Sequence, residues 1–242
     1  MGQGLSGAII AAGRGERLRE AVGGIPKPLA EVAGEALLAR QMREMRAAGM
    51  DPLHVIVNSE TARLMRERHL TLPGEADPLV RDTANSMESL LVLGERIAPG
   101  RFVLATVDAV LGAGQFRAFV TRAARLTDPG AHRFDGALGV VKWRGDKHPL
   151  FAEVTADGLI THLGETRTDT VTAGVYLFAT GIFDYSDEAR ALGLGALRRF
   201  LGLLIERGMR FAAIELDEAI DVDEGADLDA AGAMLARRRG EE

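Results

Sequence analysis

Apolar residues in this 242-residue chain form short runs that alternate with stretches of helical spacing. The first run, 5–12, has two isoleucines at its centre and is bounded by glycines, which is typical of a strand buried on both faces. Residues 35–48 show helical spacing that ends at a glycine, and 53–57 form a second apolar run. The succession of strand, loop, helix and strand predicts a parallel sheet with right-handed crossovers.

The same pattern continues to the end of the chain, but its texture changes after residue 135. Glycines and an Ala-Asp-Gly turn separate some of the later apolar runs, so part of the sheet is predicted to be antiparallel. No Pro- or Ser-rich linker divides the chain, and we expect a single domain over 1–242 with halves 1–130 and 131–242. The further predicted elements are helices over 61–69, 87–97, 188–207 and 224–238, and strands over 101–107, 136–141, 151–155, 158–163, 171–178 and 210–216.

Composition excludes several classes of protein. The 47% of apolar and 26% of charged residues are ordinary for a globular protein, and the absence of cysteine excludes disulfides and thiolate metal sites. Because the chain has no cysteine, a cytoplasmic location is the expectation. No apolar run is long enough to span a membrane, and the N-terminus lacks signal-peptide features. The net charge of -6 argues against non-specific binding of nucleic acid, and the five histidines show no zinc-binding spacing.

A glycine loop follows the first strand. Glycines 13 and 15 allow positive φ and leave backbone N–H groups uncovered, while Arg14, Arg17 and Lys27 add positive charge, which together suit a polyphosphate. Prolines on both sides of Lys27 stiffen the segment that presents its ammonium group. The alternative is a purely structural glycine turn that joins the strand to a surface helix with solvated basic residues.

The residues Ala11-Ala12-Gly13-Arg14-Gly15-Glu16-Arg17-Leu18 and Pro26-Lys27-Pro28 resemble the signature A-A-G-x-G-x-R-L and P-K-P of nucleotidyltransferases with a GT-A-like fold. That group includes enzymes acting on sugar 1-phosphates, phosphocholine, inositol phosphate and the molybdenum cofactor. The resemblance implies a three-layer α/β/α Rossmann-like fold with a mixed central sheet and a small antiparallel substrate-side extension. It implies that 1–130 binds nucleotide and 131–242 the acceptor. It makes Arg17 and Lys27 catalytic and assigns nucleotide contacts to Ala11, Ala12, Gly13, Arg14 and Gly15.

Three aspartates are candidate ligands of Mg²⁺. Asp108 follows a predicted parallel strand, where ligands of open α/β sheets gather, and a carboxylate beside a triphosphate suits this hard cation. The resemblance makes Asp108 a metal ligand, although Val107 replaces the usual glycine. Asp221 and Asp223 match the late D-x-D-x-x-x-D-L segment, with Asp221 slightly favoured. A capping role is the alternative for Asp108, as it is for Asp223 at the start of the last helix.

A polar segment over 81–90 is similar to the T-N-s-x-x-S-L segment of phosphocholine-type members, with Ala84 in place of threonine. Asn85 and Ser86 could offer amide and hydroxyl groups to a nucleobase or phosphate. Equally, Ser86 and Ser89 could only cap the helix that follows.

The second half supplies candidate acceptor contacts. Lys142, Lys147 and Glu153 lie near or between predicted strands, and Gly174 matches the A-G-x-Y-x-F strand of the family, in which glycine lets substrate approach the backbone. Where members carry a G-K pair this chain has Gly164-Glu165, so Lys142 or Lys147 could replace that lysine. A solvated basic loop is the alternative for these lysines.

Together these features predict a Mg²⁺-dependent enzyme that couples a nucleoside triphosphate to a small phosphorylated acceptor and releases pyrophosphate. CTP with a phosphocholine-like or phosphopolyol-like acceptor is favoured, followed by a sugar 1-phosphate. A GTP-dependent molybdenum-cofactor enzyme and a catalytically silent nucleotide-binding domain stay open, as does a homo-oligomer. A dehydrogenase is disfavoured, since its third glycine is missing and Asn58 replaces the acidic residue after the second strand. No nucleic-acid or membrane partner is expected.

Overall fold

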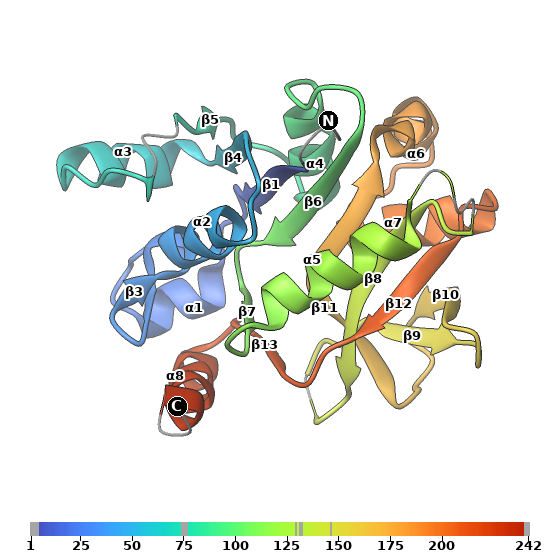
Figure 1. Cartoon of the computed structure of the whole chain (residues 1–242). Coiled ribbons are helices and arrows are strands. Elements are labelled where there is room, and N and C mark those ends of the chain that lie inside the picture. Colours follow the sequence, from blue (N-terminus) through green and yellow to red (C-terminus); the bar gives the residue numbers. More distant parts are fainter. Residues whose placement is uncertain (1–4, 74–76, 129, 131–132, 146, 240–242) are drawn as a thin grey trace.

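The computed structural model describes residues 5–73, 77–128, 130, 133–145 and 147–239. Its centre is one nine-stranded sheet that takes strands from both halves of the chain (Figure 1). The strands of this sheet are β1 (Ser6–Ala11), β4 (Leu53–Val57), β5 (Leu79–Val80), β6 (Arg101–Thr106), β8 (Gly136–Lys142), β9 (Phe151–Val154), β10 (Leu159–Gly164), β11 (Thr170–Ala179) and β12 (Phe211–Glu215).

The strands run in the order β5-β4-β1-β6-β11-β8-β12-β10-β9. β5, β4, β1 and β6 are parallel, β11 is antiparallel to both of its neighbours β6 and β8, and β12 returns parallel to β8. The β9–β10 hairpin turns through residues 155–158 and forms the far antiparallel edge. The predicted α/β fold with a mixed central sheet is therefore confirmed.

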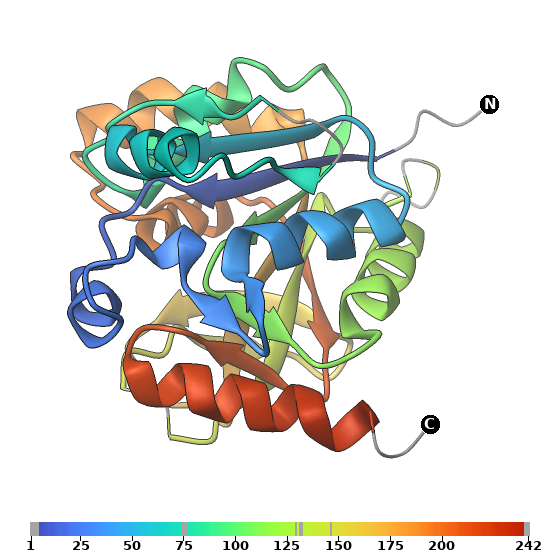
Figure 2. The same ribbon diagram turned by 90° about the vertical axis from the view of Figure 1, so that its left-hand side faces the viewer.

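Helices cover both faces of the sheet. Alternate residues of β1 explain this, because Ile9 and Ala11 join one apolar core while Ala8 and Ile10 join the other. Helices α2, α5 and α8 pack on the first core and α4, α6 and α7 on the second (Figures 1 and 2). The helices are α1 (Glu16–Ala21), α2 (Leu37–Ala47), α3 (Ser59–Glu67), α4 (Ser86–Gly94), α5 (Gln115–Leu126), α6 (Ser186–Ala191), α7 (Leu197–Glu206) and α8 (Gly225–Arg239), with 3₁₀ turns η1 (Lys27–Leu29) and η3 (Thr180–Tyr185).

Several predicted elements differ from the observed ones. The single helix predicted over 188–207 is wrong: α6 and α7 are separate, because Gly193 adopts a left-handed conformation with φ of 64° that ends the first helix. The helix predicted from residue 35 begins at Leu37. Helices α1 and α5 and two short ribbons were not predicted. No helix in the described ranges is both long and apolar enough to cross a membrane.

The two short ribbons lie outside the main sheet. β2 (Glu31–Val32) pairs with β3 (Glu35–Ala36), and β7 (Ala109–Leu111) pairs with β13 (Ala219–Asp221). The second ribbon matters for the site, because it joins the end of β6 to a segment more than a hundred residues later in the chain.

Candidate active site

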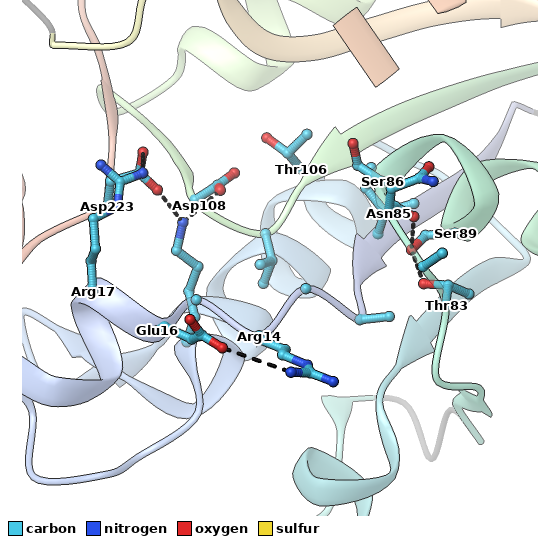
Figure 3. Close-up of a pocket in the computed structure, with 17 residues that line it drawn as sticks. Arg14, Glu16, Arg17, Thr83, Asn85, Ser86, Ser89, Thr106, Asp108 and Asp223 are labelled. Carbon is cyan, nitrogen blue, oxygen red and sulfur yellow. Dashed lines mark hydrogen bonds and ion pairs between the residues drawn. The ribbon is translucent and has the colours of Figure 1, made fainter. Parts of the chain in front are cut away.

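A cleft of about 670 Å³ opens where β1 and β6 end. Charged side chains of Arg17, Asp108 and Asp223 lie on one side of it, and the hydroxyl and amide groups of the 83–89 segment lie on the other (Figure 3). This separation suits a ligand with a phosphate end and a base end. The cleft is lined by Ile10, Ala12, Gly13, Arg14, Gly15, Glu16, Arg17, Lys27, Thr83, Ala84, Asn85, Ser86, Ser89, Thr106, Val107, Asp108 and Asp223.

The two glycines of the loop serve different purposes. Gly15 is left-handed, with φ of 56°, and a Cβ atom there would lie 2.7 Å from the Cβ atom of Lys27. Gly13 does not adopt a positive φ, and a Cβ atom there would meet nothing within 4 Å. The glycine loop therefore packs directly on Lys27 at one position and leaves open space for a ligand at the other. Of the other predicted nucleotide contacts, Ala12 and Arg14 line the cleft, and Ala11 lies in the buried end of β1.

Lys27 links two carboxylates that come from distant parts of the chain. Its Nζ atom donates to Asp108 Oδ2 and Asp223 Oδ1, each at 2.7 Å, and its side chain is only 9% exposed. Burial alone would favour the neutral amine, but the two carboxylates raise the pKa of Lys27 above its usual value. Arg17 Nη2 lies 3.3 Å from Asp223 Oδ2, so both predicted catalytic cations converge on one aspartate.

The turn that carries Asp108 is held from two sides. From α2, the buried Gln41 amide donates to the backbone carbonyls of Thr106 and Ala109. Directly after β13, the Val222 N–H donates to the Asp108 carbonyl at 3.0 Å. Burial opposes ionisation of Asp108, yet the adjacent Lys27 ammonium lowers the pKa of this carboxyl below its usual range. Asp108 is therefore a carboxylate in a rigid turn.

The three aspartates have different surroundings. β13 pairs with β7 so that Asp221 lies opposite Ala109, and Asp221 lines a second cavity together with Asp108. Although Asp221 keeps contact with solvent, repulsion from the Asp108 carboxylate raises its pKa well above the usual range. Asp223 instead faces Lys27, and Asp227 caps α8 by accepting from the N–H groups of residues 223 and 224. The alternative that the Asp223 side chain caps this helix is therefore wrong.

A neighbouring pair of carboxylates of like charge is a suitable donor set for a hard cation. The described residues contain no group of three or more His, Cys, Asp or Glu side chains placed to hold a metal ion. Mg²⁺ is usually bound through only one or two protein carboxylates. Asp108 and Asp221 would supply these two oxygen ligands, with water and phosphate oxygens completing the shell.

The polar segment before α4 is only partly committed to helix capping. Asn85 is the N-cap residue, and its Oδ1 atom accepts from Glu88 N at 3.0 Å. Ser86 Oγ accepts from the backbone N–H of Leu197 at 2.9 Å, so it connects α4 to α7 and does not cap its own helix. Ser89 Oγ lies 2.7 Å from Thr83 Oγ1, and both side chains line the cleft.

A second cavity of about 220 Å³ adjoins the cleft and shares Ser86, Thr106 and Asp108 with it. Its walls combine residues of β11 with the N-terminal end of α7. It is lined by Ser86, Thr106, Asp108, Ala109, Val141, His148, Pro149, Leu150, Val171, Thr172, Ala173, Gly174, Tyr176, Ala196, Leu197, Arg198, Ala219 and Asp221. Because Asp108 belongs to both cavities, two ligands bound side by side would meet at this carboxylate.

The four residues predicted to contact an acceptor are not gathered in this cavity. Gly174 lines it, and its φ of 68° and close approach to Thr106 and Ala109, each 2.6 Å from a Cβ atom added there, give an internal reason for glycine. Lys147 pairs with Glu224 at 2.6 Å outside the cavity. The two others lie away from both cavities: Lys142 lines a groove together with Arg122, and Glu153 is exposed on β9.

Sequence reasoning missed several residues of the second cavity. Thr106 could have been found, since it precedes Asp108 by two positions at the end of a strand. Tyr176 lies in the same strand as Gly174, and burial raises its pKa, which keeps the hydroxyl protonated. His148 and Arg198 carry no local signal, because separate segments bring them to the cavity, where Arg198 Nη2 donates to the His148 carbonyl.

Comparison with known proteins identifies the family. A family model of the MobA-like NTP transferase domain matches residues 7–174, which is more than half of the chain. The chain belongs to this family. The predicted family membership and enzyme class are thereby confirmed: this member of the MobA-like NTP transferase domain family is a nucleotidyltransferase, and the glycine loop, Lys27, the 83–89 segment and Asp108 all fall within the matched residues.

Individual relatives match this nucleotidyltransferase either over part of its length or at low sequence identity. A bifunctional IPC transferase and DIPP synthase from Rubrobacter xylanophilus is 38% identical over 112 residues, which cover 45% of this chain and 24% of that protein. The aligned region thus spans about a quarter of that relative. The inositol-1-phosphate CTP transferase from T. maritima has the same fold, with a TM-score of 0.79, 18% identity and coverage of 96% of each chain. A Bacillus anthracis protein assigned as a glucose-1-phosphate thymidylyltransferase has a TM-score of 0.77 and 16% identity, over 95% of this chain and 94% of that one.

Proposed function

We propose that this nucleotidyltransferase transfers a cytidylyl group from CTP to a small phosphorylated polyol, of which inositol 1-phosphate is the leading example, and releases pyrophosphate. The observation that carries the proposal is the pair of adjoining cavities that share Ser86, Thr106 and Asp108. The name of the T. maritima structure supports CTP as donor and inositol 1-phosphate as acceptor, and the name of the bifunctional relative supports a transferase. The cytoplasmic location and the oligomeric state stay predictions.

The larger cleft suits the nucleotide. The glycine loop, Arg17 and Lys27 would hold the phosphates, and the hydroxyl and amide groups of Thr83 and Asn85 would face the base. The smaller cavity suits the acceptor. Arg198 and the protonated hydroxyl of Tyr176 would contact its phosphate and polyol oxygens.

The reaction needs positioning and charge neutralisation more than proton transfer. An oxygen of the acceptor phosphate attacks the α-phosphorus of CTP, a new P–O bond forms, and the bond to the β-phosphate breaks with its electron pair leaving on pyrophosphate. A phosphomonoester is mostly dianionic near neutral pH, since its second pKa is about 6, so no enzymatic base is required. Lys27 would stabilise charge that develops on the α-phosphate, and Arg17 would hold the departing pyrophosphate.

The metal site would be formed by Asp108 and Asp221. Mg²⁺ bound there would neutralise phosphate charge at the boundary of the two cavities. Asp223 would position Lys27 and Arg17 rather than bind the ion, because its carboxylate already accepts from both cations. Asp221→Asn should therefore raise the Mg²⁺ concentration needed for half-maximal turnover more than Asp223→Asn does.

The test is pyrophosphate release in a matrix of CTP, UTP, ATP, GTP and dTTP against inositol 1-phosphate, phosphocholine and sugar 1-phosphates, with Mg²⁺. We expect release only with CTP and a phosphopolyol, and loss of that release in Asp108→Asn. Release with GTP alone, or with a sugar 1-phosphate alone, would replace the proposed substrates. Tight nucleotide binding without release from any pair would indicate a silent binding domain.

A further inference from the structure

Asn58 lies directly after β4 and is only 7% exposed. It is the N-cap residue of α3, where its Oδ1 atom accepts from Thr61 N at 2.8 Å. The other end of the same amide points to the glycine loop. Its Nδ2 atom donates to the backbone carbonyls of Ala12 at 3.2 Å and Gly13 at 3.4 Å. One buried side chain thus joins the start of a helix to the loop that lines the cleft.

These two bonds determine the direction of the loop N–H groups. In a trans peptide the carbonyl of one residue and the N–H of the next point to opposite sides. Holding the carbonyls of Ala12 and Gly13 towards Asn58 therefore turns the N–H groups of Gly13 and Arg14 away from it, on the side of the cleft that both residues line. Neither N–H has a hydrogen-bond acceptor among the described residues. Successive free N–H groups that face one way form a binding site for an anion.

We propose that Asn58 is a positioning residue of phosphate binding, which holds the glycine loop in the conformation that presents the Gly13 and Arg14 N–H groups to the pyrophosphate portion of the nucleotide. The inference rests on the proposed function in that the cleft receives a triphosphate. Asn58 itself does not line the cleft and acts through the loop.

The rival explanation is that Asn58 only caps α3, and two substitutions separate the roles. Asn58→Asp keeps an acceptor for Thr61 N, and aspartate is as good an N-cap as asparagine, but a carboxylate cannot donate to the loop carbonyls. Asn58→Ser also preserves a cap, places no negative charge near the phosphates and lacks the amide donor. Ser59→Ala is the matched control, because it removes the bond from Ser59 Oγ to Asp82 at the same helix end without touching the loop.

The experiment measures the affinity of the full chain for inorganic pyrophosphate, with Mg²⁺, by isothermal titration calorimetry, alongside thermal unfolding of each variant. Loss of oriented N–H bonds to an anion should weaken binding about tenfold or more in both Asn58 variants. Ser59→Ala should bind as the wild type does, and all variants should unfold within a few degrees of it.

Four results would overturn the inference. The first is wild-type affinity in both folded Asn58 variants, and the second is an equal loss in Ser59→Ala. The third is a loss in Asn58→Asp alone, which would reveal a charge effect, and the fourth is a wild-type protein that fails to bind pyrophosphate. Failure of the proposed function has a different signature, because an enzyme that uses another nucleotide or acceptor would still show the difference in pyrophosphate affinity.

Discussion

Gly15→Ala tests whether the glycine loop positions Lys27. Gly15 is the N-cap residue of α1, with φ of 56° and ψ of 40°, and Gly114 is the N-cap residue of α5, with φ of 74° and ψ of -12°. Both are left-handed, but a Cβ atom at Gly114 meets nothing within 4 Å, whereas one at Gly15 lies 2.7 Å from Lys27 Cβ. Gly114→Ala is therefore a control with the same backbone cost and no contact with the site.

The structure sets the size of both effects. A non-glycine residue in the left-handed region costs about 1–2 kcal/mol, which lowers the melting temperature of a chain of this length by roughly 2–8 °C in either variant. In Gly15→Ala, Lys27 must also move about 0.7 Å to restore an ordinary carbon contact of 3.4 Å. Its Cβ atom is attached to backbone between two prolines, so a change of rotamer cannot relieve the clash. A displacement near 1 Å in a catalytic group costs about 100-fold in rate.

Turnover from pyrophosphate release and the melting temperature from calorimetry are measured for both variants. We expect similar melting temperatures, near wild-type turnover in Gly114→Ala and a loss of about 100-fold in Gly15→Ala. If the two variants retain turnover within about threefold of each other, the close contact between Gly15 and Lys27 does not position the ammonium group and the argument fails.

Three further substitutions test the rest of the site. Lys27→Met should lower turnover about 1000-fold at saturating CTP, because the charge that develops on the phosphate loses its cation; a loss below tenfold in steady-state kinetics would contradict this role. Asp221→Asn tests the pH dependence of stability. Since the pKa of Asp221 is raised in the folded state, metal-free wild-type protein loses stability as the pH rises from the usual aspartate range through that raised pKa. In EDTA, Asp221→Asn should therefore melt above wild type at neutral pH and with it in acid, and a constant difference across pH would show that Asp108 does not repel this carboxylate. Arg198→Ala should raise KM for the acceptor about tenfold and leave KM for CTP unchanged. Equal changes in the two KM values would show that Arg198 does not contact the acceptor specifically.

Much of the fold could be predicted because the pattern is local. The two-faced burial of β1 follows from its run of apolar residues, and the β9–β10 hairpin follows from its Ala-Asp-Gly turn. The prediction failed where one residue overrides periodicity. Gly193 interrupts a leucine-rich stretch that has helical spacing on both sides, and nothing in that spacing shows that its backbone is left-handed.

The candidate site, like the fold, could be predicted from the sequence only in part. The glycine loop and Pro26-Lys27-Pro28 lie close together in the chain, so their order and spacing alone indicated a polyphosphate site. The placement of the second half could not be read in this way. Lys142, predicted to approach the acceptor, lies in a groove outside both cavities, whereas Arg198, which was not predicted, lines the smaller one.

The sequence by itself determined which chemical groups are available and which short segments are stiff, because propensity, turn chemistry and proline or glycine geometry act over a few residues. Only the tertiary structure decided which of those groups meet. The pairing of β7 with β13 brings Asp221 beside Asp108, and a single buried amide at Asn58 orients a loop more than forty residues away. Such contacts depend on strand order and on hydrogen bonds between distant segments, and no local pattern encodes them.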